Sequence, residues 1–382
     1  MENPAANPAE SARARERHLM TILRDAMLDP ALSGGCPLLG QLFATIAEEH
    51  VADALLTATP EWKIPSLLLS AALLYRAAAN AQHPLAGYLP DAASPLPIDA
   101  TFRAAARRAI ADDQSALAAL MQRHTYQCNP PRRMAVSLIA IAAATAAWEP
   151  RPARHIDVGT ASGIGLLLGQ VRALAGTASL GPTDAALQLP IELRGTSLDL
   201  RKLRHPQIEQ SIGIDLDPPD LRDAQSLAWM RACQFPLAAE WAYFDRAVEL
   251  LLHQRPRIER GSATDILPQL AADMPAGQPL IVTDSYVAVF MTEEDRERLR
   301  QELDHIARLR PVVWISNNAL VPLDTPDRTT AGTQAAAALV ERNSRALFGA
   351  VCATTWRHGK RTPELVGIAH PGGCWLEWGR PA

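Results

Sequence analysis

Two patterns of hydrophobic and polar residues divide the chain. From Arg17 to about Trp148, apolar residues recur three and four positions apart, which is typical of amphipathic helices. Prolines lie between the apolar segments, where a missing N–H group ends one helix before the next begins. The spacing predicts five helices, over residues 18–28, 37–59, 65–81, 98–124 and 132–148. We therefore expect an all-helical N-terminal domain over residues 17–150, a lid or substrate domain, after a polar and disordered start over residues 1–16.

After Pro152 the pattern changes to short β-branched runs that alternate with helical segments, which is typical of an α/β domain. The predicted strands are 155–158, 210–214, 257–260, 279–283, 311–316, 350–356 and 363–370, with a further short strand at 188–194. The predicted helices are 164–175, 221–233, 237–253, 263–272, 293–309 and 334–347. We expect residues 151–382 to form a Rossmann-like, doubly wound α/β sheet that ends in an antiparallel hairpin.

Composition and charge narrow the functional classes. Of the 382 residues, 48% are hydrophobic and 20% are charged, which is typical of a globular protein. The net charge of −4, with basic residues scattered among acids, argues against a nucleic-acid partner. The chain shows no secretory leader and no apolar run of about eighteen residues, and its five cysteines follow no metal or disulfide spacing. We expect a cytoplasmic protein without a metal or a membrane partner that acts on a small molecule; the sequence leaves its oligomeric state open.

The segment IDVGTASGIG (156–165) joins the first predicted strand to a helix. Asp157 ends the strand, and Gly159 and Gly163 allow a close approach of the backbone to a ligand and φ values that other residues avoid. In a doubly wound sheet this first turn usually receives the nucleotide. Two interpretations stay open: the turn, including Thr160 and Ala161, binds a nucleotide, or its glycines serve only the tight packing of strand and helix.

The next three strand ends carry further candidates. Asp215, followed by Leu216, ends the second strand, where a carboxylate can accept hydrogen bonds from two ribose hydroxyls. It comes 58 residues after Asp157, where such sites have about 20, and we assign the excess to a turn-rich insertion over 176–206.

Ser262 and Ala263 follow the third strand and either flank an adenine base or begin a helix, with Ser262 or Thr264 as its N-cap. Asp284 and Tyr286 follow the fourth strand, where reacting groups are often found; Asp284 is an acid beside a cationic substrate or another cap.

The absence of three common motifs narrows the classes of ligand that the site could bind. The chain has no G-x-G-x-x-G with an early acid, no G-x-x-x-x-G-K-[ST] and no G-x-S-x-G, which argues against nicotinamide, triphosphate and serine-hydrolase sites. S-adenosylmethionine fits the remaining pattern, because it carries one adenosine and no phosphates. The expected binding residues are Asp157, Gly159, Thr160, Ala161, Gly163, Asp215, Leu216, Ser262 and Ala263.

The segment HTYQCNPPRR (124–133) precedes the helix that leads into the first strand. As a lid, it would bring Tyr126 to the sulfonium by cation–π attraction, and Asn129 or Arg132 to the carboxylate of the ligand. Alternatively, it is a proline-bearing helix start with Asn129 as N-cap and solvated arginines. We name Tyr126, Asn129, Asp284 and Tyr286 as candidate catalytic residues.

The succession HTYQCNPPRRMAVSL, IDVGTASGIGLLL, GIDLDPPDLRDAQSLAWMRACQFP, RGSATDILPQL and TDSYVAVFM resembles a bacterial methyltransferase-like family known chiefly as a domain of unknown function. The resemblance runs from about Leu39 to the C-terminus and implies the fold of class I S-adenosylmethionine-dependent methyltransferases. The chain departs from the family at Ser262, where members usually carry an acid, and around Asn129, where relatives carry Asn-Glu.

These observations lead to one main hypothesis and two alternatives. The main hypothesis is an enzyme of specialised metabolism that uses the sulfonium of S-adenosylmethionine for methyl or alkyl transfer to a small molecule. In the first alternative, which the resemblance suggests, the enzyme cyclises S-adenosylmethionine to azetidine-2-carboxylate, a nonribosomal peptide precursor, and releases methylthioadenosine. In the second, the protein is a non-catalytic methyltransferase-like binder.

Overall fold

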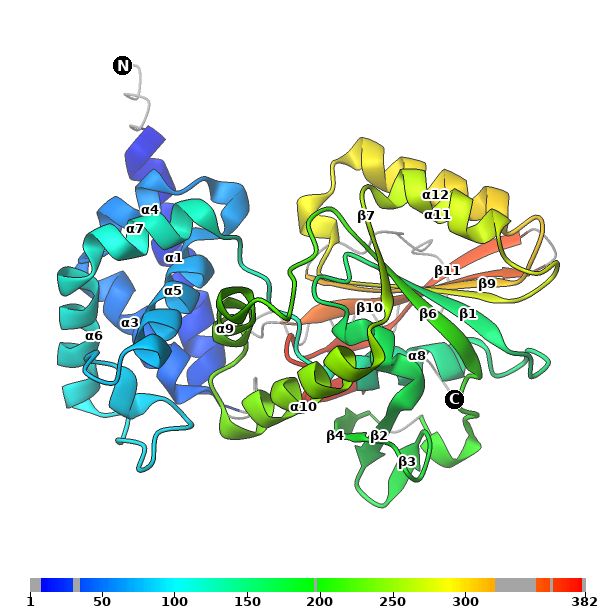
Figure 1. The fold of residues 1–382 in the computed structure, drawn as a ribbon, viewed down its shortest axis with the longest axis horizontal. Helices are drawn as coiled ribbons and strands as arrows, with labels where there is room; N and C mark the ends of the chain where they lie inside the picture. The colour runs from blue at the N-terminus through cyan, green and yellow to red at the C-terminus, as the bar shows by residue number, and fades with distance from the viewer. Residues whose placement is uncertain (1–7, 30–34, 196–197, 320–347, 358–359, 380–382) are drawn as a thin grey trace. The chain divides into compact units, whose positions relative to one another are not determined.

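The computed structural model describes residues 8–29, 35–195, 198–319, 348–357 and 360–379 (Figure 1). Its contacts divide the chain into two compact units. One unit comprises the described residues up to Cys128 together with Asp223–Ala242. The other comprises the described residues of Asn129–Arg222 and those from Tyr243 onward.

The first unit is built from helices. They are α1 (Pro8–Leu28), α3 (Pro37–Glu49), α4 (Asp53–Ala58), α5 (Pro65–Ala79), α6 (Ala100–Asp112), α7 (Gln114–Arg123) and α9 (Ala224–Ala232), with the 3₁₀ turns η1 (Glu61–Lys63) and η2 (Ala86–Tyr88). The sequence predicted single helices over 37–59 and 98–124, and both are divided in the structure. The left-handed backbone of His50 ends α3, and Asp113 separates α6 from α7.

Helix α9 comes from a distant part of the sequence but belongs to the core of this unit. Trp229 and Cys233 are buried in the same apolar cluster as Phe43 and Phe102. The indole Nε1 of Trp229 donates a 3.0 Å hydrogen bond to the carbonyl oxygen of Thr125. The WMRACQF stretch is therefore a structural part of the helical unit.

The second unit contains a nine-stranded sheet in the order β5-β12-β11-β10-β9-β8-β1-β6-β7. Its strands are β1 (Ala153–Val158), β5 (Glu192–Arg194), β6 (Ile208–Asp215), β7 (Arg257–Arg260), β8 (Leu280–Ser285), β9 (Val312–Ala319), β10 (Gly349–Arg357), β11 (Lys360–Ala369) and β12 (Trp375–Trp378). The five strands β7, β6, β1, β8 and β9 are parallel to one another, whereas β10 is antiparallel to β9 and forms an antiparallel hairpin with β11. The α/β class is confirmed.

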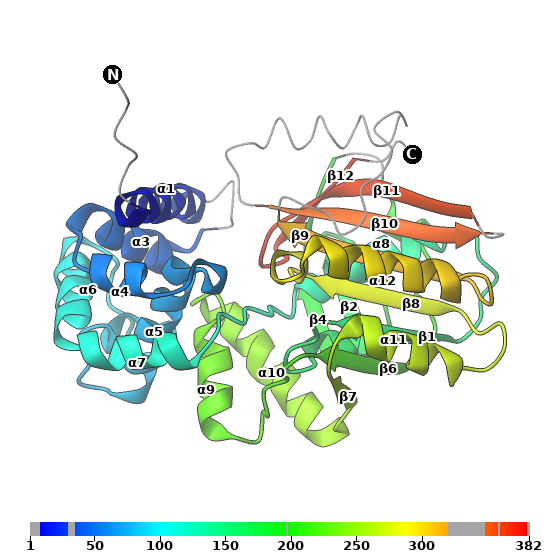
Figure 2. The same ribbon diagram turned by 90° about the horizontal axis from the view of Figure 1, so that it is seen from above.

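Helices cover both faces of this sheet. Figure 1 shows α11 (Ala263–Ala272) and α12 (Glu293–Ile306) side by side on one face, and α8 (Arg133–Ala144) on the other. Figure 2, seen from above, shows α11 and α12 in front of the strands of the sheet. Leucines of α11 and α12 pack on alternate residues of the central strands, among them Ile156 and Val282. Helix α8 is buried along most of its length and packs against β8, β9 and β10. The unit also contains α10 (Ala238–Gln254), whose first turn belongs to the first unit, and the 3₁₀ turn η5 (Ala288–Phe290).

The predicted helix over 164–175 is wrong in its second half. Residues Ile164–Gln170 form the 3₁₀ helix η3, and the chain then enters the strand β2 (Val171–Ala175). This strand pairs with β3 (Ala178–Leu180) and β4 (Leu187–Pro190) in a separate three-stranded sheet. The 3₁₀ turn η4 (Leu200–Lys202) follows. The 57 residues between Asp157 and Asp215 therefore hold a small sheet and the edge strand β5.

The predicted helix over 334–347 lies outside the described residues. In the part of the chain that the structure describes, no helix combines the length and the apolar character needed to cross a membrane.

Candidate functional site

The order of the parallel strands reverses between β1 and β8. Along the chain the strands run β1, β6, β7 to one side of β1 and then β8, β9 to the other. The two connections leave the carboxyl ends of β1 and β8 in opposite directions and open a crevice between them, which is where ligands bind in open α/β sheets. Asp157 of β1 and Thr283 of β8 are partners in register at this position.

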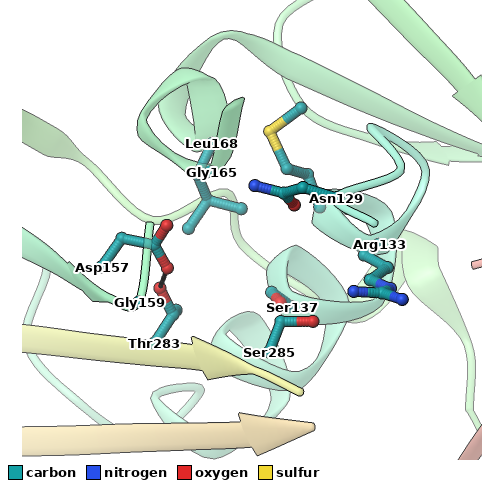
Figure 3. Close-up of a pocket in the computed structure, with 10 residues that line it drawn as sticks. Asn129, Arg133, Ser137, Asp157, Gly159, Gly165, Leu168, Thr283 and Ser285 are labelled. Carbon is teal, nitrogen blue, oxygen red and sulfur yellow. Dashed lines mark hydrogen bonds between the residues drawn. The ribbon is translucent and has the colours of Figure 1, made fainter. Parts of the chain in front are cut away.

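A pocket lies at this reversal (Figure 3). Alternation along the strands directs Asp157, Thr283 and Ser285 to the α8 face, away from Ile156 and Val282. The pocket is lined by Asn129, Arg133, Met134, Ser137, Asp157, Gly159, Gly165, Leu168, Thr283 and Ser285. Its cavity volume of about 30 Å³ suits a charged group the size of an ammonium, but not a whole nucleoside.

Asp157 is the buried acid of this pocket. Its side chain accepts a 2.6 Å hydrogen bond from the Thr283 hydroxyl, which Figure 3 shows as a dashed line. Burial raises the pKa of Asp157 to about 6, against the opposing effect of the Thr283 hydroxyl. A side chain at Gly165 would collide with the carboxylate oxygen Oδ2. The carboxyl thus lies at the edge of protonation near neutral pH, in a space that only glycine leaves open.

The turn after β1 takes backbone conformations that favour glycine. Gly159 and Gly163 have φ values of +66° and +90°, and Ala161 has φ +49°. A side chain at Gly159 would meet the side chain of Val287. The amide N–H of Ala161 donates a 2.8 Å hydrogen bond to Oδ2 of Asp215, and Asn129 donates through Nδ2 to the Thr160 carbonyl at 3.2 Å. The turn is therefore held between β6 and the start of the α8 segment.

The predicted Asp215 and Leu216 lie together at the end of β6. The second oxygen of Asp215, Oδ1, accepts from the amide of Asp217 at 2.9 Å, so each carboxylate oxygen keeps a further lone pair for another donor. Leu216 is 72% exposed. Asp217 forms an ion pair with Arg260 of β7, which ties the turns after β6 and β7 together.

Ser262 and Ala263 begin α11, as predicted. Ser262 is the N-cap residue, but its side chain makes no capping hydrogen bond; its hydroxyl lies 2.8 Å from that of Thr264. Both residues are half-buried at the edge of the sheet next to the β6 turn. They lie outside the pocket at Asp157.

Asp284 points to the opposite face of the sheet from Asp157. Its buried carboxyl accepts hydrogen bonds from Trp314 Nε1 at 2.7 Å, from Asn318 Nδ2 at 2.5 Å and from Ser316 Oγ at 3.2 Å. Burial raises the pKa of Asp284 to about 7. These contacts give Asp284 a place in the packing under α11 and α12, and it does not line the pocket.

Tyr286 and Arg133 form a stacked pair beside the pocket. The guanidinium carbon of Arg133 lies 4.1 Å from the centroid of the Tyr286 ring, and its Nε donates to the carbonyl oxygen of Pro371 at 2.5 Å. Tyr286 has φ +60°, a strained conformation for a residue with a side chain.

The remaining candidates of the HTYQCNPPRR segment have different positions. Tyr126 belongs to the helical unit and packs, half-buried, against its apolar core. The N-cap of α8 is Arg132, so the alternative that Asn129 caps this helix is wrong. Arg133 lines the pocket, whereas the predicted Arg132 does not.

Pattern reasoning also missed Ser137, Gly165, Thr283 and Ser285, which line the pocket. The available signals were the third glycine of the turn and the alternation in VTDS, which places Thr283 and Ser285 on one face and Asp284 on the other.

Two comparisons with known proteins bear on the site. A family model described as "Uncharacterized protein conserved in bacteria (DUF2332)" matches residues 29–378, which include every residue of the pocket. No curated protein matches the chain.

Proposed function

We propose that this chain, which belongs to the uncharacterized bacterial family DUF2332, is an enzyme that binds S-adenosylmethionine at the carboxyl edge of the sheet. The enzyme uses the sulfonium of this ligand to alkylate a small molecule. The observation that carries the proposal is the pocket at the strand-order reversal, with turns that follow β1, β6 and β7 in succession beside it.

The order β7-β6-β1-β8-β9 supports a Rossmann-like sheet of the methyltransferase kind. In such a sheet the ligand spans the ends of several strands rather than filling one cavity. The small pocket then receives only one end of the ligand, and the nucleoside extends over the turns after β6 and β7.

The residues fit such a ligand along its length. Asp215 has lone pairs for ribose hydroxyls, and the exposed Leu216 offers an apolar surface to the base, next to Ser262 and Ala263. Asp157 is the partner for the ammonium group of the amino-acid end. Asn129 and Arg133, which line the same pocket, are the partners for its carboxylate.

When bound, S-adenosylmethionine would supply an electrophilic carbon attached to a positively charged sulfur. The residues of this chain hold the amino-acid end in a buried place and exclude water from Asp157. Orientation and desolvation of this kind contribute several kcal/mol to a group transfer. Arg133 and Tyr286 are positioned to order the pocket wall beside the reacting end.

Calorimetry with S-adenosylhomocysteine tests the proposal. We expect saturable heat for the full-length protein and a loss of at least tenfold in affinity for Asp157→Asn, because the variant keeps the shape of the side chain but removes its charge. Asp184→Asn is the matched control, since the Asp184 side chain is exposed and lies outside the pocket. Absence of binding at millimolar ligand, or equal affinity of wild type and Asp157→Asn, would refute the proposed site.

A further inference from the structure

Four side chains, those of Ser211, His155, Thr283 and Asp157, form a continuous series of hydrogen bonds across three strands, which we call the relay. The register pairs His155 of β1 with Ser211 of β6, and Asp157 with Thr283 of β8. His155 Nδ1 lies 3.1 Å from the Ser211 hydroxyl, and its Nε2 lies 2.8 Å from the Thr283 hydroxyl. Thr283 in turn lies 2.6 Å from Asp157. His155 is fully buried, so these contacts replace the water that would otherwise solvate its ring nitrogens.

When Asp157 is ionised, its carboxylate fixes which atom donates and which accepts in every hydrogen bond of the relay. Ionised Asp157 can only accept, so Thr283 must donate its single hydroxyl proton to it. Thr283 then accepts from His155, whose proton must be on Nε2. Burial lowers the pKa of His155 to about 3, so the ring is neutral and its bare Nδ1 accepts from Ser211.

Protonation of Asp157 permits the opposite direction. The carboxylic acid can donate to Thr283, which then donates to Nε2, and His155 carries its proton on Nδ1 and donates to Ser211. The relay therefore has two arrangements of its hydrogen-bond donors, and the charge of Asp157 determines the tautomer of His155. No imidazolium ion is required in either arrangement.

We propose that Ser211, His155 and Thr283 are positioning residues that orient Asp157 toward the pocket, and that the Thr283 hydroxyl favours the ionised carboxylate, so that the pocket selects ligands with a positively charged group. The inference rests on the proposed function only for the identity of the ligand. The relay contacts Asp157 whether or not a ligand is bound.

Other groups around Asp157 act on the same carboxyl. Asp215 on β6 raises the pKa of Asp157 by repulsion, and Asp157 in turn raises the pKa of Asp284 on the far face of β8. The Thr160 side chain in the turn lowers the pKa of Asp157. Arg133 is the charged residue that α8 contributes to the pocket wall. Since these groups stay unchanged in variants of the relay, a shift of the Asp157 titration can be assigned to the relay.

Titration of the Asp157 carboxyl carbon by NMR, in the ligand-free full-length protein, tests the near end of the relay. Thr283→Val removes the hydroxyl at nearly constant shape, and we expect the midpoint to rise by about one pH unit or more, because a hydrogen bond to a charged group is lost. Thr283→Ser keeps the hydroxyl and should keep the wild-type midpoint. An unchanged midpoint in Thr283→Val overturns the proposal.

Ser211 tests the far end, because it touches His155 but not Asp157. In Ser211→Ala the Nδ1 atom loses its hydrogen-bond partner in either arrangement, so we expect the ¹⁵N shift of Nδ1 to change while the proton stays on Nε2 as long as Asp157 is ionised. Ser211→Thr, which retains a hydroxyl, is the control. A His155 that carries its proton on Nδ1 in the wild type at pH 8 contradicts the relay.

A ligand pair separates this inference from the proposed function. S-adenosylhomocysteine carries an ammonium group and methylthioadenosine does not. We expect Thr283→Val to weaken binding of the first near pH 6.5 and to leave the second unchanged. Equal weakening of both ligands overturns the selectivity. If neither ligand binds the wild type, the proposed function fails, and the NMR titrations still decide on the relay.

Discussion

At the scale of single residues, the pocket depends on a missing side chain as much as on an acid. Asp157 ends a buried strand, and Gly165, eight residues later, leaves room for its carboxyl. The acid and the glycine are visible in the sequence, but their contact is not, because η3 brings the chain back over the strand end. Arg132 and Arg133 show the same limit: they are adjacent in sequence at the start of α8, but of the two only Arg133 lines the pocket.

Gly165→Ala should disable the pocket without removing any polar group. The added methyl would overlap the Asp157 carboxyl, so we expect loss of S-adenosylhomocysteine binding by calorimetry and a decrease of about 1–3 kcal/mol in the free energy of unfolding. Gly169→Ala is the matched control in the same 3₁₀ helix, since its methyl would meet only the side chain of Ile208, at 3.2 Å. Wild-type affinity in Gly165→Ala would show that Asp157 can move without consequence.

At the scale of elements, local patterns predicted those strands and helices whose own residues determine them. The strand over 257–260 and the helix over 263–272 have their predicted ends. The helix over 164–175 was wrong because GLLLGQVRALA is apolar enough for either structure, and its second half pairs with β4, a partner that the local pattern does not reveal. The breaks at His50 and Asp113 were missed because no proline or glycine marks them.

Helix starts offer a comparison at this scale. Thr292 and Asp295 form a reciprocal capping box at α12, whereas Ser262 at α11 makes no capping bond. Chemical denaturation of Thr292→Ala should therefore show a loss of about 1 kcal/mol in the free energy of unfolding. Ser262→Ala should change the free energy of unfolding by only a few tenths of a kcal/mol, because its side chain makes no capping hydrogen bond. An equal loss in both variants would mean that the hydroxyl of Ser262 stabilises α11 by another route.

At the scale of the whole molecule, two buried acids make the free energy of unfolding depend on pH. Burial raises the pKa of Asp157 to about 6 and that of Asp284 to about 7. The folded protein therefore binds these protons more tightly than the unfolded chain. This contribution to stability is fully present below about pH 4, the range of an unperturbed aspartate, and is lost as pH rises through 6 and 7.

Asp284→Asn isolates one of these contributions. The variant stays neutral at every pH, so the free energy of unfolding of the wild type should fall relative to that of Asp284→Asn between pH 5 and pH 8. Thermal or urea unfolding of both proteins across this range measures the difference. Asp217→Asn, an exposed position, should give a curve parallel to the wild type. A constant difference between wild type and Asp284→Asn would show that Asp284 does not titrate in this interval.

The sequence by itself determined the alternation of strands and helices and the acids and glycines at the strand ends, because hydrophobic period and turn chemistry are local properties. It pointed to Asp157, the glycine turn and Asp215 as neighbours in one edge of a sheet. Only the tertiary structure decided which side chains share a face there. It separated Asp284 from Asp157, joined Ser211 to Asp157 through two intermediates, and placed Arg133 in the pocket. Strand order and register, which set these relations, depend on contacts between residues far apart in the chain.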